Sequence, residues 1–130
     1  MKKYVSIGIG GACGALLRHF IQLIPLPISA VYRPLLTMLI NISGSFLLGF
    51  LLILFVKYLP VKPEIRLGIT TGFLGGYTTF STLCKDSVML CFSGHVLLSA
   101  FYVGASVLFG LAAAWLGILA AKQLERRHAS

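Results

Sequence analysis

The sequence Gly72-Phe73-Leu74-Gly75-Gly76-Tyr77-Thr78-Thr79-Phe80-Ser81-Thr82 decides the fold, because it interrupts a stretch that is otherwise apolar enough to cross a membrane. It lies within the uncharged run between Arg66 and Lys85. Glycine costs roughly 1 kcal/mol relative to alanine in a helix interior, and serine and threonine hydroxyls compete for nearby backbone groups. Hydrocarbon tolerates irregular backbone only where protein or a wet cavity covers it. We therefore predict a membrane helix with a break near residues 75–80.

Such a break has two interpretations. Freed carbonyls and helix ends form ion sites in broken-helix transporters. Alternatively, Gly68 and Gly72 form a small-residue face for helix packing. Packing alone does not require a hydroxyl-rich run directly after Gly75 and Gly76, so the pattern favours an ion site.

The composition indicates a membrane protein. Of the 130 residues, 58% are hydrophobic and only 11% are charged, whereas soluble domains carry about 25% charged residues. A spanning helix needs about 20 mostly apolar residues. We expect an all-α protein with a single transmembrane domain over residues 1–130, built from four helices at approximately 4–24, 35–57, 66–92 and 95–121. The N-terminal run resembles a secretory signal, but its glycines and Arg18 favour a retained first span.

The net charge of +8 is explained by topology rather than by a nucleic-acid partner. With four spans, both termini and the second loop lie on one side. Eight basic residues fall there: Lys2, Lys3, Lys57, Lys62, Arg66, Lys122, Arg126 and Arg127. The opposite side has three: Arg18, Arg33 and Lys85. Because basic residues favour the cytoplasmic side, we predict a multi-pass protein of the cell membrane with both termini in the cytoplasm.

The acidic residues argue against proton-coupled transport, and we expect a transport protein rather than an enzyme. Glu64, Asp86 and Glu125 are the only carboxylates, and none sits in the middle of a predicted span. Proton-coupled transporters need an ionisable group inside the membrane, and small four-helix exporters use an acidic residue in their first helix. The pattern therefore favours passive conduction, with a coupled exporter as the alternative. The three cysteines lack a metal-binding spacing, so free thiols are expected.

Several polar residues fall inside the predicted spans. Asn41 is central in a stripe with Thr37 and Ser45, at four-residue spacing on one helical face. Its amide either makes an interhelical hydrogen bond, worth roughly 0.6–2 kcal/mol in membranes, or donates to a permeating anion. Tyr102 and Ser106 repeat the spacing in the last span, which predicts that this face points inward.

Arg18 also has two interpretations. At 1.5 Å per residue it lies about 21 Å along a helix from the N-terminal lysines, near the opposite interface. It either extends to the lipid headgroups or attracts anions to a vestibule.

Three motifs together resemble the Fluc (CrcB) fluoride channels. The motifs are Gly10-Gly11-Ala12-Cys13-Gly14-Ala15-Leu16-Leu17-Arg18, Thr37-Met38-Leu39-Ile40-Asn41-Ile42-Ser43-Gly44-Ser45-Phe46, and the glycine-threonine-phenylalanine run quoted above. The resemblance covers the whole chain, with four spans and the motifs in order.

That resemblance implies a passive channel that exports fluoride from the cytoplasm and lowers its toxicity. It also implies an antiparallel, dual-topology dimer with two pores and a central structural sodium ion at the dimer interface. The backbone carbonyls of Gly75 and Thr78 would hold the sodium. The pore residues it implies are Asn41, Phe80, Ser81, Thr82, Tyr102 and Ser106, with Arg18 in the vestibule. An aromatic ring has a positive edge that can meet an anion.

Two positions depart from the family pattern. Leu83 stands where the family usually has a second phenylalanine, and Gly110 stands where a polar residue is usual. Both departures remove a group that could contact an anion. The charge count of eight against three also biases insertion toward one orientation. We therefore expect either a homodimer that tolerates mixed insertion, or a heterodimer in which a homologous subunit of opposite topology completes one pore and this chain's own pore does not conduct.

Overall fold

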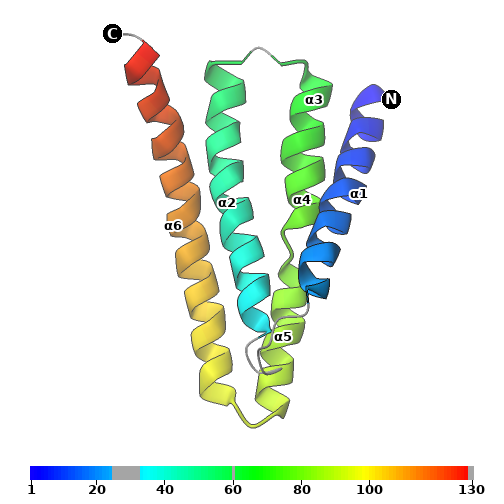
Figure 1. Ribbon diagram of the computed structural model, residues 1–130, viewed down its shortest axis with the longest axis vertical. Coiled ribbons are helices and arrows are strands. Elements are labelled where there is room, and N and C mark those ends of the chain that lie inside the picture. The colour runs from blue at the N-terminus through cyan, green and yellow to red at the C-terminus, as the bar shows by residue number, and fades with distance from the viewer. Residues whose placement is uncertain (25–32, 60, 129–130) are drawn as a thin grey trace.

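The computed structural model describes residues 1–24, 33–59 and 61–128, and it is entirely helical in that part (Figure 1). The elements in chain order are α1 (Lys2–Leu23), α2 (Pro34–Lys57), α3 (Pro63–Leu67), the π-helix η2 (Gly68–Phe73), α4 (Leu74–Tyr77), α5 (Phe80–Phe92) and α6 (Val96–His128). The predicted all-α class is confirmed.

Three helices are long and apolar enough to cross a membrane in the described residues: α1, α2 and the part of α6 from Val96 to Leu124. With 22, 24 and 29 residues, each is long enough to cross a hydrocarbon core of about 30 Å, which needs about 20 predominantly apolar residues. Proline at the first position of α2 suits a helix start, where its missing N–H costs nothing. Large apolar side chains cover the outside of these helices, among them Phe20, Leu39 and Trp115.

The fourth predicted span is a succession of short elements rather than one helix. It runs through α3, η2 and α4, is extended at Thr78 and Thr79, and resumes as α5. Figure 1 shows the narrow connection between α4 and α5. That this run crosses the membrane as one broken span stays a prediction.

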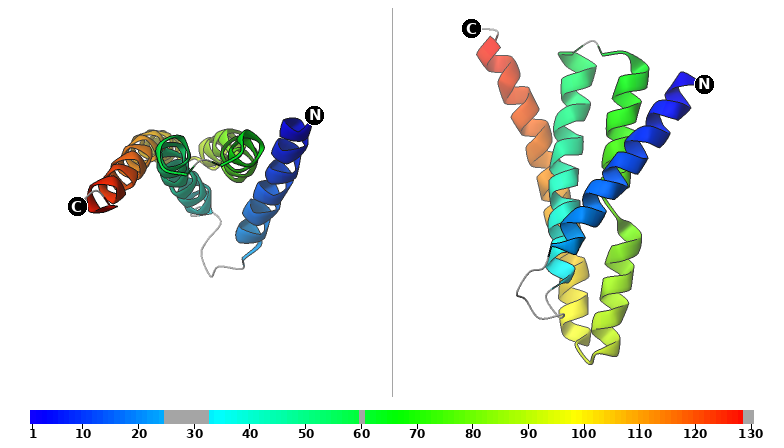
Figure 2. Two further views of the ribbon diagram at one scale, coloured as in Figure 1. Left: turned by 90° about the horizontal axis from the view of Figure 1, so that it is seen from above. Right: turned by 45° about the vertical axis from the view of Figure 1, so that its right-hand side comes forward.

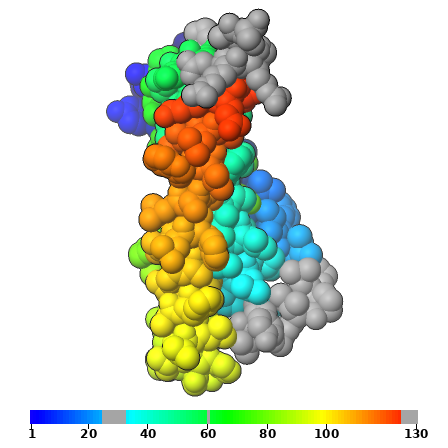
Figure 3. Space-filling view, turned by 90° about the vertical axis from the view of Figure 1, so that its left-hand side faces the viewer, coloured from blue at the N-terminus to red at the C-terminus, as the bar shows by residue number. Residues whose placement is uncertain are grey.

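Close glycine contacts join the helices into two pairs. α1 packs against η2 and α4, which it crosses at an angle (Figure 2). A Cβ added to Gly10 or Gly14 would overlap the carbonyl oxygen of Gly68 or Phe73, respectively. α2 packs chiefly against α6 (Figure 3), and there a Cβ on Gly49 would overlap the carbonyl of Ala114. Small residues at such contacts allow backbones to approach in membranes.

Both ends of the described chain and the connection from α2 to α3 lie at one end of the molecule (Figure 1). The connection from α5 to α6 lies at the opposite end and turns at Gly94, whose φ of +81° is the left-handed conformation that glycine adopts without strain. This arrangement agrees with the predicted grouping of the termini and the second loop.

The helix bounds differ from the sequence-based ones by three or more residues at two places. The third helical run begins at Pro63 instead of residue 66, because proline is well placed at a helix start. The last helix continues to His128 instead of ending at residue 121, because no glycine or proline follows to stop it. The π-helical turn over Gly68–Phe73 was not predicted from the sequence.

Candidate functional site

The interruption between α4 and α5 is built from two extended threonines. Thr78 has φ −74° and ψ 156°, and Thr79 has φ −150° and ψ 121°. The Thr79 hydroxyl accepts a hydrogen bond from the Thr82 amide at 3.1 Å, which makes Thr79 the N-cap of α5. The hydroxyls of Ser81 and Thr82 lie 3.2 and 3.0 Å from the same oxygen. The hydroxyl-rich run thus starts the second half-helix.

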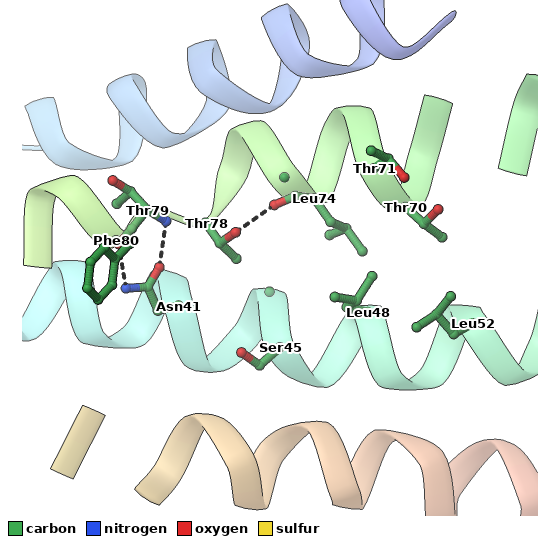
Figure 4. Close-up of a pocket in the computed structure, with 12 residues that line it drawn as sticks. Asn41, Ser45, Leu48, Leu52, Thr70, Thr71, Leu74, Thr78, Thr79 and Phe80 are labelled. Atoms are coloured by element: carbon green, nitrogen blue, oxygen red, sulfur yellow. Dashed lines mark hydrogen bonds between the residues drawn. The ribbon is translucent and has the colours of Figure 1, made fainter. Parts of the chain in front are cut away.

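Asn41 on α2 holds the backbone of Thr79 at two points (Figure 4). Its Nδ2 donates to the Thr79 carbonyl at 2.9 Å, and its Oδ1 accepts from the Thr79 amide at 2.7 Å. The predicted interhelical bond is therefore present. One hydrogen of Nδ2 is not used by this pair, so a contact with an anion stays a prediction.

Backbone carbonyls at the interruption lose their usual helical donors, as the last carbonyls of any helix do. In an α-helix each amide donates to the carbonyl four residues earlier. The amide of Thr79 would serve Gly75 but donates to Asn41, and the amide of Thr82 would serve Thr78 but donates to the Thr79 hydroxyl. Gly75 and Thr78, the two residues predicted to hold a cation, therefore both lose their usual helical donors.

Arg18 lies on α1 beside the interruption and is partly buried. Its Nε donates to the Gly76 carbonyl at 3.3 Å, and its Nη1 donates to the Thr82 hydroxyl at 3.5 Å. Both acceptors are neutral oxygens, one before and one after the break.

An open groove of about 650 Å³ separates α2 from the η2–α4 run and reaches the interruption (Figure 4). Asn41 and Ser45 line it from α2, and Gly75, Thr78 and Phe80 line it from the other side. Gly75 is exposed, and a Cβ added there would meet nothing within 4 Å. Polar backbone and hydroxyl groups therefore face open space at this point.

Phe80 and Leu83 point in different directions although they are one turn apart. Phe80 is 79% exposed, whereas Leu83 is only 8% exposed and packs in a cluster with Leu90 and Tyr102. The ring is thus largely uncovered by its own chain, whereas the leucine belongs to the core.

Tyr102 and Ser106 form a second polar group, on the inward face of α6. Both side chains are 5% exposed, and neither hydroxyl has a hydrogen bond of standard geometry within the described residues. Buried polar groups normally have partners; Thr37 and Asp86 lie close to the Tyr102 hydroxyl, and the Ser106 hydroxyl has no hydrogen bond within the described residues. The inward orientation predicted for this face is confirmed by the burial.

Gly110 lies further along the same helix, where an added Cβ would sit 3.8 Å from the Ser45 hydroxyl. A polar side chain at this position would reach the α2 stripe. Gly110 has no side chain and therefore does not make that contact.

Sequence reasoning missed two polar pairs. The Thr37 hydroxyl donates to the Asp86 carboxylate at 2.7 Å, and the Ser99 hydroxyl donates to the Ser87 carbonyl at 2.8 Å. The four-residue spacing of Thr37 and Asn41 identified Thr37 as a polar residue of interest, but no sequence signal identified its partner Asp86. Ser99 lies seven residues before Ser106, on the same face of α6, and that spacing could have identified it.

The comparison with a family model and the comparison with known proteins point to the same family. The family model "CrcB-like protein, Camphor Resistance (CrcB)" matches residues 5–118. "Fluoride-specific ion channel FluC 2" of Geobacillus kaustophilus is 42% identical over 126 residues, with 96% of each chain covered. "Fluoride-specific ion channel FluC 1" of Brucella melitensis is 44% identical over 117 residues, covering 88% of this chain and 95% of the relative. The FluC of Chlorobaculum tepidum is 39% identical, covering 94% and 96%.

Proposed function

The chain belongs to the CrcB family, whose relatives above are named fluoride-specific ion channels, and from this premise we propose that it conducts fluoride passively out of the cell. It is a membrane channel protein and not an enzyme. The observation that carries the proposal is the 42% identity to a fluoride-specific channel across 96% of both chains. Hydrogen fluoride enters cells as a weak acid and ionises inside, so a passive anion leak lowers its accumulation.

The positions of the carboxylates support passive conduction over proton coupling. Asp86 is bonded to Thr37, which is only three residues from the start of α2, so this carboxylate lies near a helix end. Glu64 lies in the first turn of α3, also at an end. A carrier that loads and releases protons needs an ionisable group within the membrane, and these two residues do not provide one there.

The open groove supports a second subunit, which we propose to be antiparallel to this chain. Carbonyls and hydroxyls that line it cannot face hydrocarbon, where each unpaired polar group costs several kcal/mol. A second subunit covering the groove would bury them and would receive the exposed ring of Phe80. Each pore would then combine the Asn41, Tyr102 and Ser106 side chains of one subunit with a phenylalanine from the other.

The carbonyls of Gly75 and Thr78 fit a structural sodium ion at the centre of such a dimer. Gly75 and Thr78 offer neutral backbone oxygens, which a hard monovalent cation accepts, at the end of a half-helix where the dipole favours positive charge. In the described part of the chain, no group of three or more histidine, cysteine, aspartate or glutamate side chains could hold a metal. The donor set therefore suits sodium better than a transition metal.

The partner is a second copy or a homologous subunit of opposite topology. Eight basic residues lie on the side of the termini and three on the other side, which favours one orientation in the cell membrane, with both termini in the cytoplasm. Leu83 and Gly110 favour the heterodimer, because they leave this chain's own pore without a ring and a polar group. In that case this chain supplies Phe80 to the conducting pore of its partner.

A growth experiment tests the function in cells. A bacterial strain without its own fluoride channel is given this chain alone, or with a homologue of opposite charge bias, and is grown in fluoride. We expect resistance in at least one of the two strains, and resistance only with the homologue identifies the heterodimer. Sensitivity in both, despite expression in the membrane, would contradict a fluoride channel.

A further inference from the structure

Arg18 bridges the two half-helices of the interruption. Gly76, whose carbonyl accepts from Nε at 3.3 Å, lies in α4 before the break. Thr82, whose hydroxyl accepts from Nη1 at 3.5 Å, lies in the first turn of α5 after it. We propose that Arg18 is a positioning residue that fixes α4 and α5 relative to each other, in addition to any attraction it exerts on anions.

The electrostatics of the helix ends favour this role. The last carbonyls of a helix carry a partial negative charge, so a cation near them is stabilised by roughly 0.3–1 kcal/mol, and by more when partly buried. Arg18 is partly buried and approaches the second-last residue of α4. Both contacts are longer than the usual range of about 2.7–3.2 Å, so neither bond is strong alone and the bridge depends on both being made by the same guanidinium.

The packing of α1 brings the guanidinium to this place. Gly14 and Gly11 lie four and seven residues before Arg18, on the same face of the helix. Their backbones contact Phe73 and Gly76, since a Cβ on Gly14 would overlap the Phe73 carbonyl and one on Gly76 would overlap the Gly11 carbonyl. The two helices are therefore fixed to each other one turn from the guanidinium.

The bridge continues from Arg18 to α2. Thr82 lies 3.0 Å from the Thr79 hydroxyl, and the Thr79 backbone is held by Asn41. Arg18 also occupies the carbonyl of Gly76, which lies between the two carbonyls proposed to hold sodium. A planar guanidinium reaches two separate acceptors at once, whereas lysine offers a point charge on a flexible stem. A lysine at position 18 should therefore not substitute for Arg18, although it keeps the positive charge.

The test compares Arg18→Lys and Arg18→Gln in vesicles that contain the assembled channel, and its transport readout rests on the proposed function. We expect both variants to lower the maximal fluoride efflux rate about tenfold, as the loss of a charged hydrogen bond implies, with the half-saturating fluoride concentration unchanged. Lys3→Gln is the control. A normal rate in Arg18→Lys, with Arg18→Gln changing only the half-saturating concentration, would show simple anion attraction and overturn the proposal.

A second pair of variants keeps the proposal testable if the first fails to assemble. Thr82→Val removes the acceptor, and Thr82→Ser keeps it. We expect Thr82→Val to lower the unfolding temperature as Arg18→Lys does, with the double variant no worse than the worse single variant. Additive effects, or unfolding temperatures equal to wild type, would overturn the bridge. If wild type carries no fluoride, the proposed function fails, but these unfolding temperatures still decide the role of Arg18.

Discussion

Asn41 shows at the scale of a single residue how the break in the helix is stabilised. Its side-chain amide replaces the helical partners of Thr79, at 2.9 Å for the carbonyl and 2.7 Å for the amide. An unpaired backbone group inside a membrane would cost several kcal/mol. The same side chain lines the groove that leads to the interruption, so its structural role coincides with its proposed place in the ion pathway.

Replacing Asn41 with aspartate separates these functions from folding. An ionised carboxylate only accepts hydrogen bonds, so it would face the Thr79 carbonyl without a donor and would repel a permeating anion. We expect fluoride efflux to fall to the background of empty vesicles, while the protein still elutes as a folded dimer. Leu39→Ala, an exposed position on the same helix, should conduct normally. Normal conduction by the Asn41→Asp variant would show that Asn41 serves only in helix packing and not in conduction.

Replacing Leu83 with phenylalanine tests the departure from the family pattern. The new ring would sit beside Tyr102 and present a positive edge to the pore. We expect efflux through this chain's own pore to rise several-fold when the chain is expressed alone, although overpacking costs about 1–3 kcal/mol of stability. Leu83→Met, of similar volume, is the control and should leave efflux unchanged. A phenylalanine variant that folds but conducts no better than wild type would show that this position does not limit conduction.

At the scale of elements, glycines set how closely α1 approaches the η2–α4 run. Gly10, Gly14 and Gly76 place backbone against backbone across this contact. The contact matters for function because it positions α1 beside the interruption and brings Arg18 within reach of Gly76. The helix pair therefore acts as a support for the site.

Alanine substitutions on α1 provide a matched test of this support. Gly14→Ala would place a methyl group against the Phe73 carbonyl, whereas Gly8→Ala would meet nothing within 4 Å. We expect the first change to destabilise the protein by about 1–3 kcal/mol or more and the second to be neutral or to stabilise by up to about 1 kcal/mol. Thermal unfolding in detergent measures both. Equal unfolding temperatures would show that α1 is not closely packed in the membrane.

The sequence predicted the existence of the helices better than their details. Long apolar runs with few charges identified three of them directly, and the glycine and threonine run located the interruption at Thr78 and Thr79. The π-helical turn, which packs against α1, was not predicted because no local sequence signal marked it. The pairing of Asn41 with Thr79 also needed the structure, since neighbours across helices are set by packing.

At the scale of the whole molecule, the described chain leaves polar groups uncovered next to its apolar helices. An open groove reaches the interruption, and residues with backbone carbonyls and hydroxyl groups line it. Hydrocarbon offers no hydrogen-bond partners to such groups. The proposed antiparallel partner would cover this groove and complete at least one pore. The distribution of basic residues biases the insertion of this chain toward one orientation, and the growth experiment distinguishes a copy of this chain from a homologue as the partner.

Removing sodium tests the centre of the proposed dimer. An ion that binds only the assembled state stabilises it by about 2.7 kcal/mol at one hundred times its dissociation constant. We expect the purified dimer to unfold at a lower temperature when sodium is replaced by a large organic cation, and to recover when sodium returns. Recovery with calcium but not with sodium, or no change at all, would contradict a sodium site at Gly75 and Thr78.

Fluoride efflux from vesicles is the most direct test of the central claim, that the protein is a passive fluoride channel. Vesicles that contain the purified dimer are loaded with potassium fluoride, and external fluoride is followed with an electrode. We predict that efflux starts only when a potassium ionophore allows charge to balance, and that chloride-loaded vesicles retain their anion. Efflux driven by a pH gradient without the ionophore would show coupled transport and would contradict the claim.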